Sequence, residues 1–219
     1  MGSVMEQSRP PATTGSLIRW AFWYDLLVWT VSLGREGEFR ERALDLAEVK
    51  CGDAVLDIGC GTGTLAIAAR HRVGLRGSVC GVDASPEMIA RAERKAKKAA
   101  VQIAFSNVPA ETLPFSGGQF DVVLSTVMLH HLPRKTRQEC FREVRRVLKP
   151  SGRLLAIDFA GSSGHGSGIR ILARFHRHGR IHFPELITML GEAGLDCVRQ
   201  GEVGVGGLHF VIATAQEAK

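Results

Sequence analysis

The stretch that decides the fold is Val55-Leu-Asp-Ile-Gly-Cys-Gly-Thr-Gly63. Its first half carries the short apolar run of a strand that is covered on both faces. Its second half carries three glycines at alternate positions, and glycine lets a backbone turn sharply and approach a ligand closely. A helical pattern begins at Thr64, so the turn ends at a helix N-terminus with available backbone N–H groups. The sequence therefore predicts a nucleotide-cofactor site at residues 59–63.

A second block, Gly81-Val-Asp83, predicts another short strand that ends on an acidic residue. Asp83 follows Gly63 by 20 residues (83 − 63), a spacing at which a carboxylate can bind two ribose hydroxyls. The dinucleotide fingerprint would place a third glycine at position 64, where this chain has Thr64. The two blocks together indicate a nucleoside cofactor other than a dinucleotide.

Two further blocks follow in order, Phe120-Asp-Val-Val-Leu-Ser-Thr-Val-Met-Leu-His-His-Leu-Pro133 and Glu143-Val-Arg-Arg-Val-Leu-Lys-Pro-Ser-Gly-Arg-Leu-Leu-Ala-Ile-Asp158. With these four ordered motifs the chain resembles the class I S-adenosylmethionine-dependent methyltransferases. More narrowly, it is similar to their menaquinone/ubiquinone C-methyltransferase branch. The resemblance covers residues 20–160 well and the last sixty residues loosely. It implies S-adenosylmethionine as the cofactor and S-adenosylhomocysteine as its product.

The resemblance also implies where the cofactor lies. Asp83 would accept hydrogen bonds from the ribose hydroxyls, and Ala84 and Met88 would border the adenine. The methionine part would lie against the ends of the first and fourth predicted strands. The residues that would surround it there are Asp57, Gly59, Cys60, Gly61, Thr62, Gly63, Ser125 and Thr126.

The chain departs from the family pattern at the adenine motif. The family usually has an aspartate shortly before Ala-Glu-x-Leu-Pro-Phe, whereas this chain has Asn107-Val-Pro109 before its Ala110-Glu-Thr-Leu-Pro-Phe115. Either Asn107 or the backbone of Ala110 and Glu111 would then hold the adenine amino group.

The order of patterns predicts a doubly wound α/β fold. Helical patterns, the first at 36–49, alternate with strands near 54–58, 78–83, 101–105, 120–125 and 153–158. Residues 195–203 and 208–214 predict a hairpin. The family resemblance makes its second strand the one antiparallel member of a seven-stranded, mostly parallel Rossmann-like sheet with helices on both faces. Ligands of such sheets bind beyond the C-terminal ends of the strands.

Composition indicates one globular domain, with 219 residues of which 45% are hydrophobic and 23% charged. Residues 1–16 predict a flexible tail, and residues 17–219 a single methyltransferase domain. The five cysteines have no close pairs, so neither a disulfide framework nor a zinc site is indicated. No long apolar run or signal segment is seen, which predicts a cytoplasmic protein and leaves peripheral membrane contact open.

The net charge of +6 is spread over 91–98, 134–149 and 170–180. In the first two stretches basic residues alternate with apolar and acidic ones at helical spacing, which is typical of solvated helix faces. Nucleic-acid binding is not favoured, because no pattern of stacking aromatics accompanies the charge.

Two stretches outside the cofactor motifs could select the acceptor. Residues 17–33 hold all three tryptophans and the only tyrosine, and predict either a helix packed on the sheet or an aromatic cover over the active site. Residues 160–182 predict an insertion with a glycine-rich start and a basic amphipathic segment. Its histidines, His176, His178 and His182, have no acidic residue or cysteine nearby, so no metal site is expected.

For catalysis, a phenol or an activated ring carbon gains from a residue that accepts a proton. His130 is the preferred candidate. Its neighbour in the His130-His131 pair is expected to be a hydrogen-bonded structural group. Tyr24, by resemblance, lies near cofactor and substrate and is the second candidate, with Asp158 and His165 as alternatives.

The sequence as a whole predicts methyl transfer to a small, partly apolar acceptor, with an aromatic or quinol-like ring preferred. A phospholipid or small amine, or a thiol or specialised metabolite, is the alternative acceptor. A silent S-adenosylmethionine-binding subunit is the alternative of another class. Both a monomer and a homodimer fit the sequence.

Overall fold

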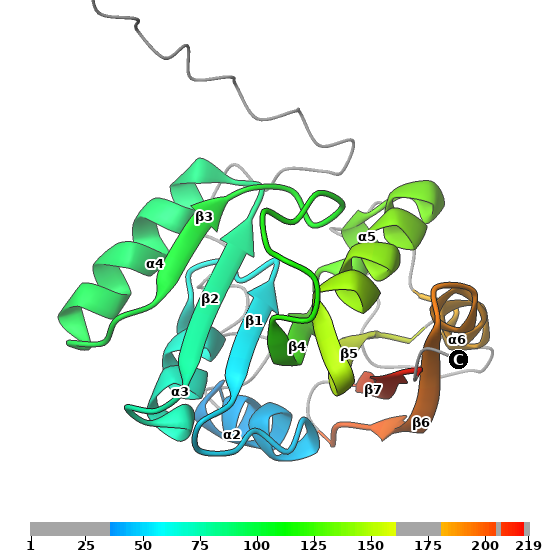
Figure 1. The fold of residues 1–219 in the computed structure, drawn as a ribbon, viewed down its shortest axis with the longest axis horizontal. Helices are drawn as coiled ribbons and strands as arrows, with labels where there is room; N and C mark the ends of the chain where they lie inside the picture. The colour runs from blue at the N-terminus through cyan, green and yellow to red at the C-terminus, as the bar shows by residue number, and fades with distance from the viewer. Residues whose placement is uncertain (1–35, 161–180, 205–206, 217–219) are drawn as a thin grey trace, which may run out of the picture.

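The computed structural model describes residues 36–160, 181–204 and 207–216. The predictions for the tail, for the aromatic cover with Tyr24, and for His165 and most of the 160–182 insertion fall outside these ranges. One sheet of seven strands organises the described residues, as Figure 1 shows. The strands are β1 (Ala54–Ile58), β2 (Ser78–Asp83), β3 (Ala104–Asn107), β4 (Phe120–Thr126), β5 (Leu148–Phe159), β6 (Leu195–Glu202) and β7 (Leu208–Ala215).

The strand order is β3-β2-β1-β4-β5-β7-β6. The first five strands in this order pair in parallel, and β7 pairs antiparallel with both β5 and β6. This confirms the predicted doubly wound sheet with one reversed strand. Chain order reverses between β1 and β4, and such a switch point is where open α/β sheets bind ligands beyond the strand ends.

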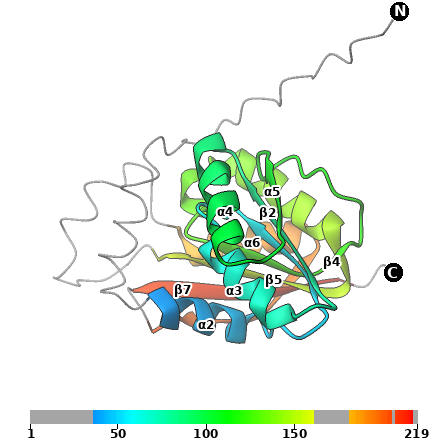
Figure 2. The same ribbon diagram turned by 90° about the vertical axis from the view of Figure 1, so that its left-hand side faces the viewer.

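Helices cover both faces of the sheet and create two hydrophobic cores (Figure 2). On one face α2 and α3 bury Leu44 and Leu65, and on the other α5 and α6 bury Phe141 and Leu190. Each such burial contributes roughly 1.5–3 kcal/mol. The helices are α2 (Glu36–Leu46), α3 (Thr64–Val73), α4 (Pro86–Lys98), α5 (Arg134–Val147), α6 (Phe183–Glu192) and the 3₁₀ turn η1 (Leu129–His131).

Helix α4 begins immediately beyond Asp83 because three local signals coincide there. The Ser85 hydroxyl accepts a hydrogen bond from the Met88 N–H at 3.3 Å, Pro86 supplies a preset φ, and Glu87 complements the helix dipole. Lysines gather in the last turn, where the dipole favours positive charge. The cap thus fixes the start of α4 next to the end of β2.

Helix α2 and strand β3 differ from the predicted bounds. The helical pattern extended to Val49, but α2 ends at Leu46 because Glu48 is left-handed (φ 52) and the Val49 N–H closes onto the Leu44 carbonyl at 3.0 Å. Strand β3 begins at Ala104 rather than at residue 101, since pairing with β2 starts at Ala104. The apolar residues before it pack beside α4 instead of extending the strand.

Strand β5 is longer than predicted. Its regular part matches the predicted 153–158, and it also includes Leu148, which pairs with Phe120 across a register shift. Ser151 in between is left-handed (φ 61), which marks the irregular segment. The predicted hairpin strands are confirmed within one residue as β6 and β7.

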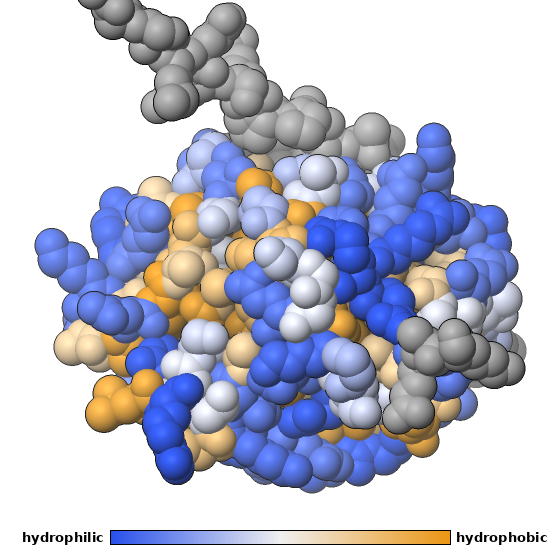
Figure 3. Space-filling model, viewed as in Figure 1, coloured by the Kyte–Doolittle hydropathy of each residue, from blue (hydrophilic) through white to orange (hydrophobic). Residues whose placement is uncertain are grey.

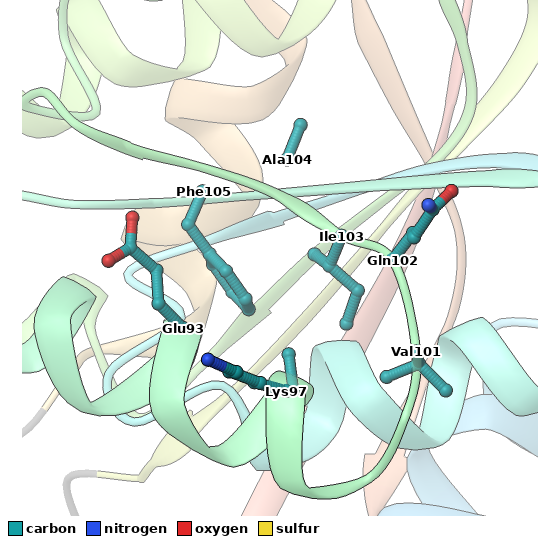
Figure 4. A pocket seen from close by; sticks show the side chains of 8 residues that line it. Glu93, Lys97, Val101, Gln102, Ile103, Ala104 and Phe105 are labelled. Atoms are coloured by element: carbon teal, nitrogen blue, oxygen red, sulfur yellow. The ribbon is translucent and has the colours of Figure 1, made fainter.

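A shallow hollow of about 510 Å³ lies at the outer edge of the sheet, between α4 and the start of β3. Figure 3 shows apolar residues gathered on this side of the molecule. In Figure 4 the side chains of Phe105, in β3, and of Ile103, just before it, point toward α4, where Glu93 and Lys97 flank the opening. No predicted cofactor residue lines this hollow, so the candidate site lies elsewhere, at the C-terminal ends of the strands.

Candidate cofactor site

The glycine turn after β1 is held by backbone and side-chain hydrogen bonds. The Cys60 N–H donates to the Val82 carbonyl, and the Gly61 N–H donates to Oδ2 of Asp83, both at 2.9 Å. The Gly63 N–H donates back to the Cys60 carbonyl, also at 2.9 Å, before α3 starts. The turn is therefore anchored to the end of β2, which holds the C-terminal ends of β1 and β2 side by side.

Two of the turn glycines occupy positions that no other residue could fill. Gly59 has φ 67, and a Cβ there would lie 2.3 Å from Cγ of Met128. Gly63 has φ 78, and its Cβ would lie 2.9 Å from both Ala92 and Phe105. Because both contacts are closer than real Cβ atoms allow and both φ values are left-handed, the sequence needs glycine here for packing as well as for turning.

Asp83 ends β2 with both carboxylate oxygens directed by backbone amides. Its Oδ1 accepts from the Ser85 N–H at 2.8 Å and its Oδ2 from the Gly61 N–H at 2.9 Å. Burial raises the pKa of Asp83, and these two amide bonds oppose the rise. A carboxylate oxygen can accept more than one hydrogen bond, so Asp83 keeps acceptor capacity for ribose hydroxyls.

Asn107 lies beside Asp83 at the end of β3. Its Nδ2 donates to the Asp83 carbonyl at 2.9 Å, which fixes the orientation of the side-chain amide. The amide oxygen is consequently directed away from that carbonyl. An oxygen in this position can accept a hydrogen bond from an amino group, which is the role that the resemblance implied for Asn107.

Asp57 contrasts with Asp83, although it ends the adjacent strand. Its side chain is 1% exposed, and neither oxygen has a hydrogen-bond partner among the described residues. Burial, and next the charge of Asp83, raise the pKa of Asp57 to about 8; the backbone amide of Ala66 opposes the rise without making a regular hydrogen bond to either oxygen. Ser125, paired opposite Ile58 at the end of β4, has a buried hydroxyl that likewise lacks a partner in the described part of the chain.

These atoms fit S-adenosylmethionine. A carboxyl group buried without a partner is costly unless a ligand supplies a cation or a donor, and the cofactor carries an ammonium and a sulfonium group. Asp57 and Ser125 would bind its methionine part, and Asp83 its ribose.

The other predicted cofactor residues divide into two groups. Thr126 and Ala84 are half-buried at the ends of β4 and β2, close to the residues above. Met88 and Cys60 are almost fully buried, and burial raises the pKa of the Cys60 thiol well above its ordinary value, which suits a packing role. Ala110 is also buried, and Glu111 is half-buried in the segment after β3.

The end of β5 carries a buried histidine–carboxylate pair. Nδ1 of His130 lies 2.7 Å from Oδ1 of Asp158, and the His130 backbone N–H donates to Oδ2 at 3.1 Å. The Phe159 N–H donates to Oδ1 at 2.8 Å. His131 is half-buried and packs against His130 in a tilted arrangement, with ring centroids 3.9 Å apart. The sequence predicted the hydrogen-bonded structural role for His131, whereas in the structure His130 is the imidazole that is bonded to a buried carboxylate.

The backbone between β4 and η1 is strained. Val127 has φ 54, which is rare for a β-branched residue, and its N–H donates to the Ile157 carbonyl at 2.8 Å. The turn directs Met128 onto Gly59 and leads into His130. No local signal in the sequence pointed to Met128, because its partner lies 69 residues away (128 − 59).

Two features are absent from the described residues. Within residues 36–160, 181–204 and 207–216 there is no group of three or more His, Cys, Asp or Glu side chains that could hold a metal ion. Over the same ranges, no helix is long and apolar enough to cross a membrane.

Known proteins show the family to which this site belongs. The family model of a methyltransferase domain matches residues 55–152. The demethylmenaquinone methyltransferase of Thermus thermophilus is 33% identical over 168 residues, which are 77% of this chain and 71% of the relative. The chain belongs to the class I S-adenosylmethionine-dependent methyltransferases.

Within that family this methyltransferase lies in the quinone C-methyltransferase branch. The 2-phytyl-1,4-naphtoquinone methyltransferase of Trichormus variabilis is 36% identical over 138 residues, and the matched part is 62% of this chain and 59% of that relative. A solved S-adenosylmethionine-dependent methyltransferase from Aquifex aeolicus has the same fold, with a TM-score of 0.67 at 24% identity over 80% of this chain and 88% of that one. The cofactor of this methyltransferase is S-adenosylmethionine.

Proposed function

We propose that this methyltransferase methylates a ring carbon of a quinol-like aromatic acceptor. The observation that carries the proposal is the buried His130–Asp158 pair at the same edge of the sheet as the cofactor turn. Relatives in the quinone branch support the acceptor class, since their names specify demethylmenaquinone and a phytyl-substituted naphthoquinone.

The bound cofactor supplies an electrophilic methyl group on a sulfonium sulfur. The protein must align the acceptor behind that methyl group and exclude water. A new bond from the ring carbon to the methyl group forms as the sulfur–methyl bond breaks, and the sulfur keeps the electron pair. The ring carbon must then lose its hydrogen as a proton, so an acceptor of this class needs a base, whereas a thiolate or a neutral amine attacks directly.

His130 is suited to accept that proton. With Asp158 bound at Nδ1, the neutral imidazole carries its hydrogen there, and Nε2 is the basic nitrogen. The carboxylate also stabilises the imidazolium that forms, as in other histidine–carboxylate pairs. The bonds from the backbone N–H groups of His130 and Phe159 hold Asp158 in place, so the pair is preorganised.

The proposal is tested by transfer of labelled methyl from S-adenosylmethionine to four acceptors, namely a reduced 2-alkyl-1,4-naphthoquinol, phosphatidylethanolamine vesicles, a small amine and a small thiol. Transfer to the naphthoquinol alone is expected. Transfer to the amine, lipid or thiol instead would overturn the acceptor assignment. Cofactor binding without transfer to any acceptor would favour a silent binding subunit.

The role of His130 is tested separately with His130→Gln, using His131→Gln as the matched control. We expect kcat to fall by about 10²-fold or more in His130→Gln. The affinity for S-adenosylmethionine should stay within about threefold of the unmodified protein, less than 1 kcal/mol. Equal losses of kcat in both variants would assign His130 a structural role.

A further inference from the structure

Helix α4 contacts the cofactor turn at two successive positions. A Cβ at Gly63 would lie 2.9 Å from Cβ of Ala92 and 2.9 Å from Cζ of Phe105 in β3, so Ala92 lies close against the turn. One turn further along the same helix face, Nζ of Lys95 lies 2.6 Å from Oγ1 of Thr62. The helix therefore touches two consecutive residues of the turn, although they precede Lys95 by about thirty residues in the sequence.

The Lys95–Thr62 contact is a directional hydrogen bond. An ammonium group has only donors, so the threonine oxygen is the acceptor. Bonds from a charged donor are stronger than neutral ones, and this bond is shielded because Thr62 is 4% exposed. The neighbouring Lys97 and Lys98 lie in the same helical turn and are exposed, whereas Lys95 is half-buried and reaches Thr62. Lys95 is thus distinguished from the basic residues of the solvated face.

We propose that Lys95 is a positioning residue for S-adenosylmethionine, acting through Thr62 to hold the glycine turn in its binding geometry. Thr62 stands between Gly61, whose N–H is bound to Asp83, and Gly63, which packs against Ala92. The turn is consequently fixed at its two flanking residues by β2 and α4, and at its centre by Lys95. Without the central bond the turn can sample other conformations, so cofactor affinity falls while the chemical step is unaffected.

The inference is tested by titrating the purified full-length protein with S-adenosylmethionine, which needs no acceptor. Its outcome is therefore independent of the proposed quinol-like acceptor. Lys95→Met removes the donor and keeps the length of the side chain, Thr62→Val removes the acceptor, and the double variant closes a thermodynamic cycle. Lys98→Met, from the same helical turn, is the matched control.

We expect Kd for S-adenosylmethionine to rise about three- to tenfold in Lys95→Met. With any acceptor that supports turnover, KM for the cofactor should rise equally and kcat should not change. The same lysine substitution should have no further effect in the Thr62→Val background, and Lys95→Arg should restore most of the affinity. Lys98→Met should match the unmodified protein.

Three results would overturn the inference. The first is a Kd for Lys95→Met that equals that of Lys98→Met. The second is an effect of Lys95→Met that is as large in the Thr62→Val background as in the otherwise unmodified protein, which would show that the two residues act separately. The third is a rise in Kd that disappears under conditions where all variants are fully folded by circular dichroism.

Discussion

Two aspartates end strands of the same sheet and are equally buried, yet their surroundings are opposite. Asp158 at the end of β5 is 1% exposed and takes bonds from Nδ1 and the backbone N–H of His130 and from the backbone N–H of Phe159. Asp57 at the end of β1 is also 1% exposed and has no hydrogen-bond partner among the described residues. The first carboxyl group is satisfied by the protein itself, whereas the second requires a ligand.

The difference separates a part of the site that is complete in the folded chain from a part that the cofactor completes. A buried polar group without a partner costs roughly 1–3 kcal/mol, and more if it is charged. A group that is fully bonded instead contributes to stability and is costly to remove. Substitutions of these two aspartates should therefore have different effects on folding and on binding.

The largest effect is expected from Asp158→Ala. It removes three hydrogen bonds and leaves the His130 ring, the buried His130 N–H and the part-buried Phe159 N–H without their acceptor. The free energy of unfolding should fall by about 2–4 kcal/mol, measured by urea denaturation. The control is Asp196→Ala on an exposed strand position, which should change stability by less than about 0.5 kcal/mol. Equal small losses in both variants would remove the contrast between Asp158 and Asp57.

The second prediction concerns pH and the cofactor-free protein. Asp57 keeps its proton in the folded chain up to about pH 8, whereas in the unfolded chain it loses it near its ordinary value of 3.8. The folded state therefore binds more protons in this window, and stability must fall as pH rises through it, by up to about 1.4 kcal/mol per pH unit. Asp83 acts in the same direction, because its pKa is also raised.

This prediction is checked by thermal unfolding between about pH 6 and pH 8 in the unmodified protein and in Asp57→Asn. The unmodified protein should lose stability across the range, and the variant should show a flatter profile and bind S-adenosylmethionine more weakly. Parallel profiles in the two proteins would mean that another group titrates in this range.

Asp83→Asn sharpens the comparison, because Asp83 lies between the two cases. Its carboxylate is bonded by two backbone amides, as that of Asp158 is bonded by the protein, and it can still accept hydrogen bonds from a ligand. We expect Kd for S-adenosylmethionine to rise at least about tenfold, or about 1.4 kcal/mol, measured by isothermal titration. If the affinity instead stays within about threefold, under 1 kcal/mol, the ribose role of Asp83 is wrong.

The smallest effect is expected from Ser125→Ala. The Ser125 hydroxyl is buried without a partner in the described residues, so its removal should change the free energy of unfolding by less than about 0.5 kcal/mol. Ser85 is a matched buried serine whose hydroxyl caps α4, and Ser85→Ala should cost about 1 kcal/mol. Urea denaturation of both variants tests the pair, and an equal loss in each would show that Ser125 is already bonded in the folded protein.

The cofactor edge of the sheet could be predicted well from the sequence because its signals are local. The strand, turn and helix around residues 54–64 lie within eleven consecutive positions, and Asp83 follows at a spacing that a single β-α-β unit fixes. The same holds for the hairpin of β6 and β7, where a glycine-rich connection separates two stretches of strand.

The contacts that join distant positions could not be predicted from the sequence. Lys95 belongs to a run of basic residues that predicts only a solvated helix face, and its partner Thr62 is 33 residues away. The sequence alone does not distinguish the two adjacent histidines. The pairing of β4 with β5 brings Asp158 next to His130. The start of β3 was misplaced for a related reason, because pairing with β2 and not the apolar pattern determines where the strand begins.

The position of β7 has a consequence for how the protein is made. It lies between β5 and β6 in the sheet, although the chain places it after both. During synthesis β6 therefore leaves the ribosome with no strand to pair with, and β5 keeps one open edge until β7 emerges. Exposed strand edges of this kind invite pairing between chains. We expect the nascent chain to need protection by a chaperone during that interval, and truncation within residues 208–215 to yield aggregated rather than merely unstable protein.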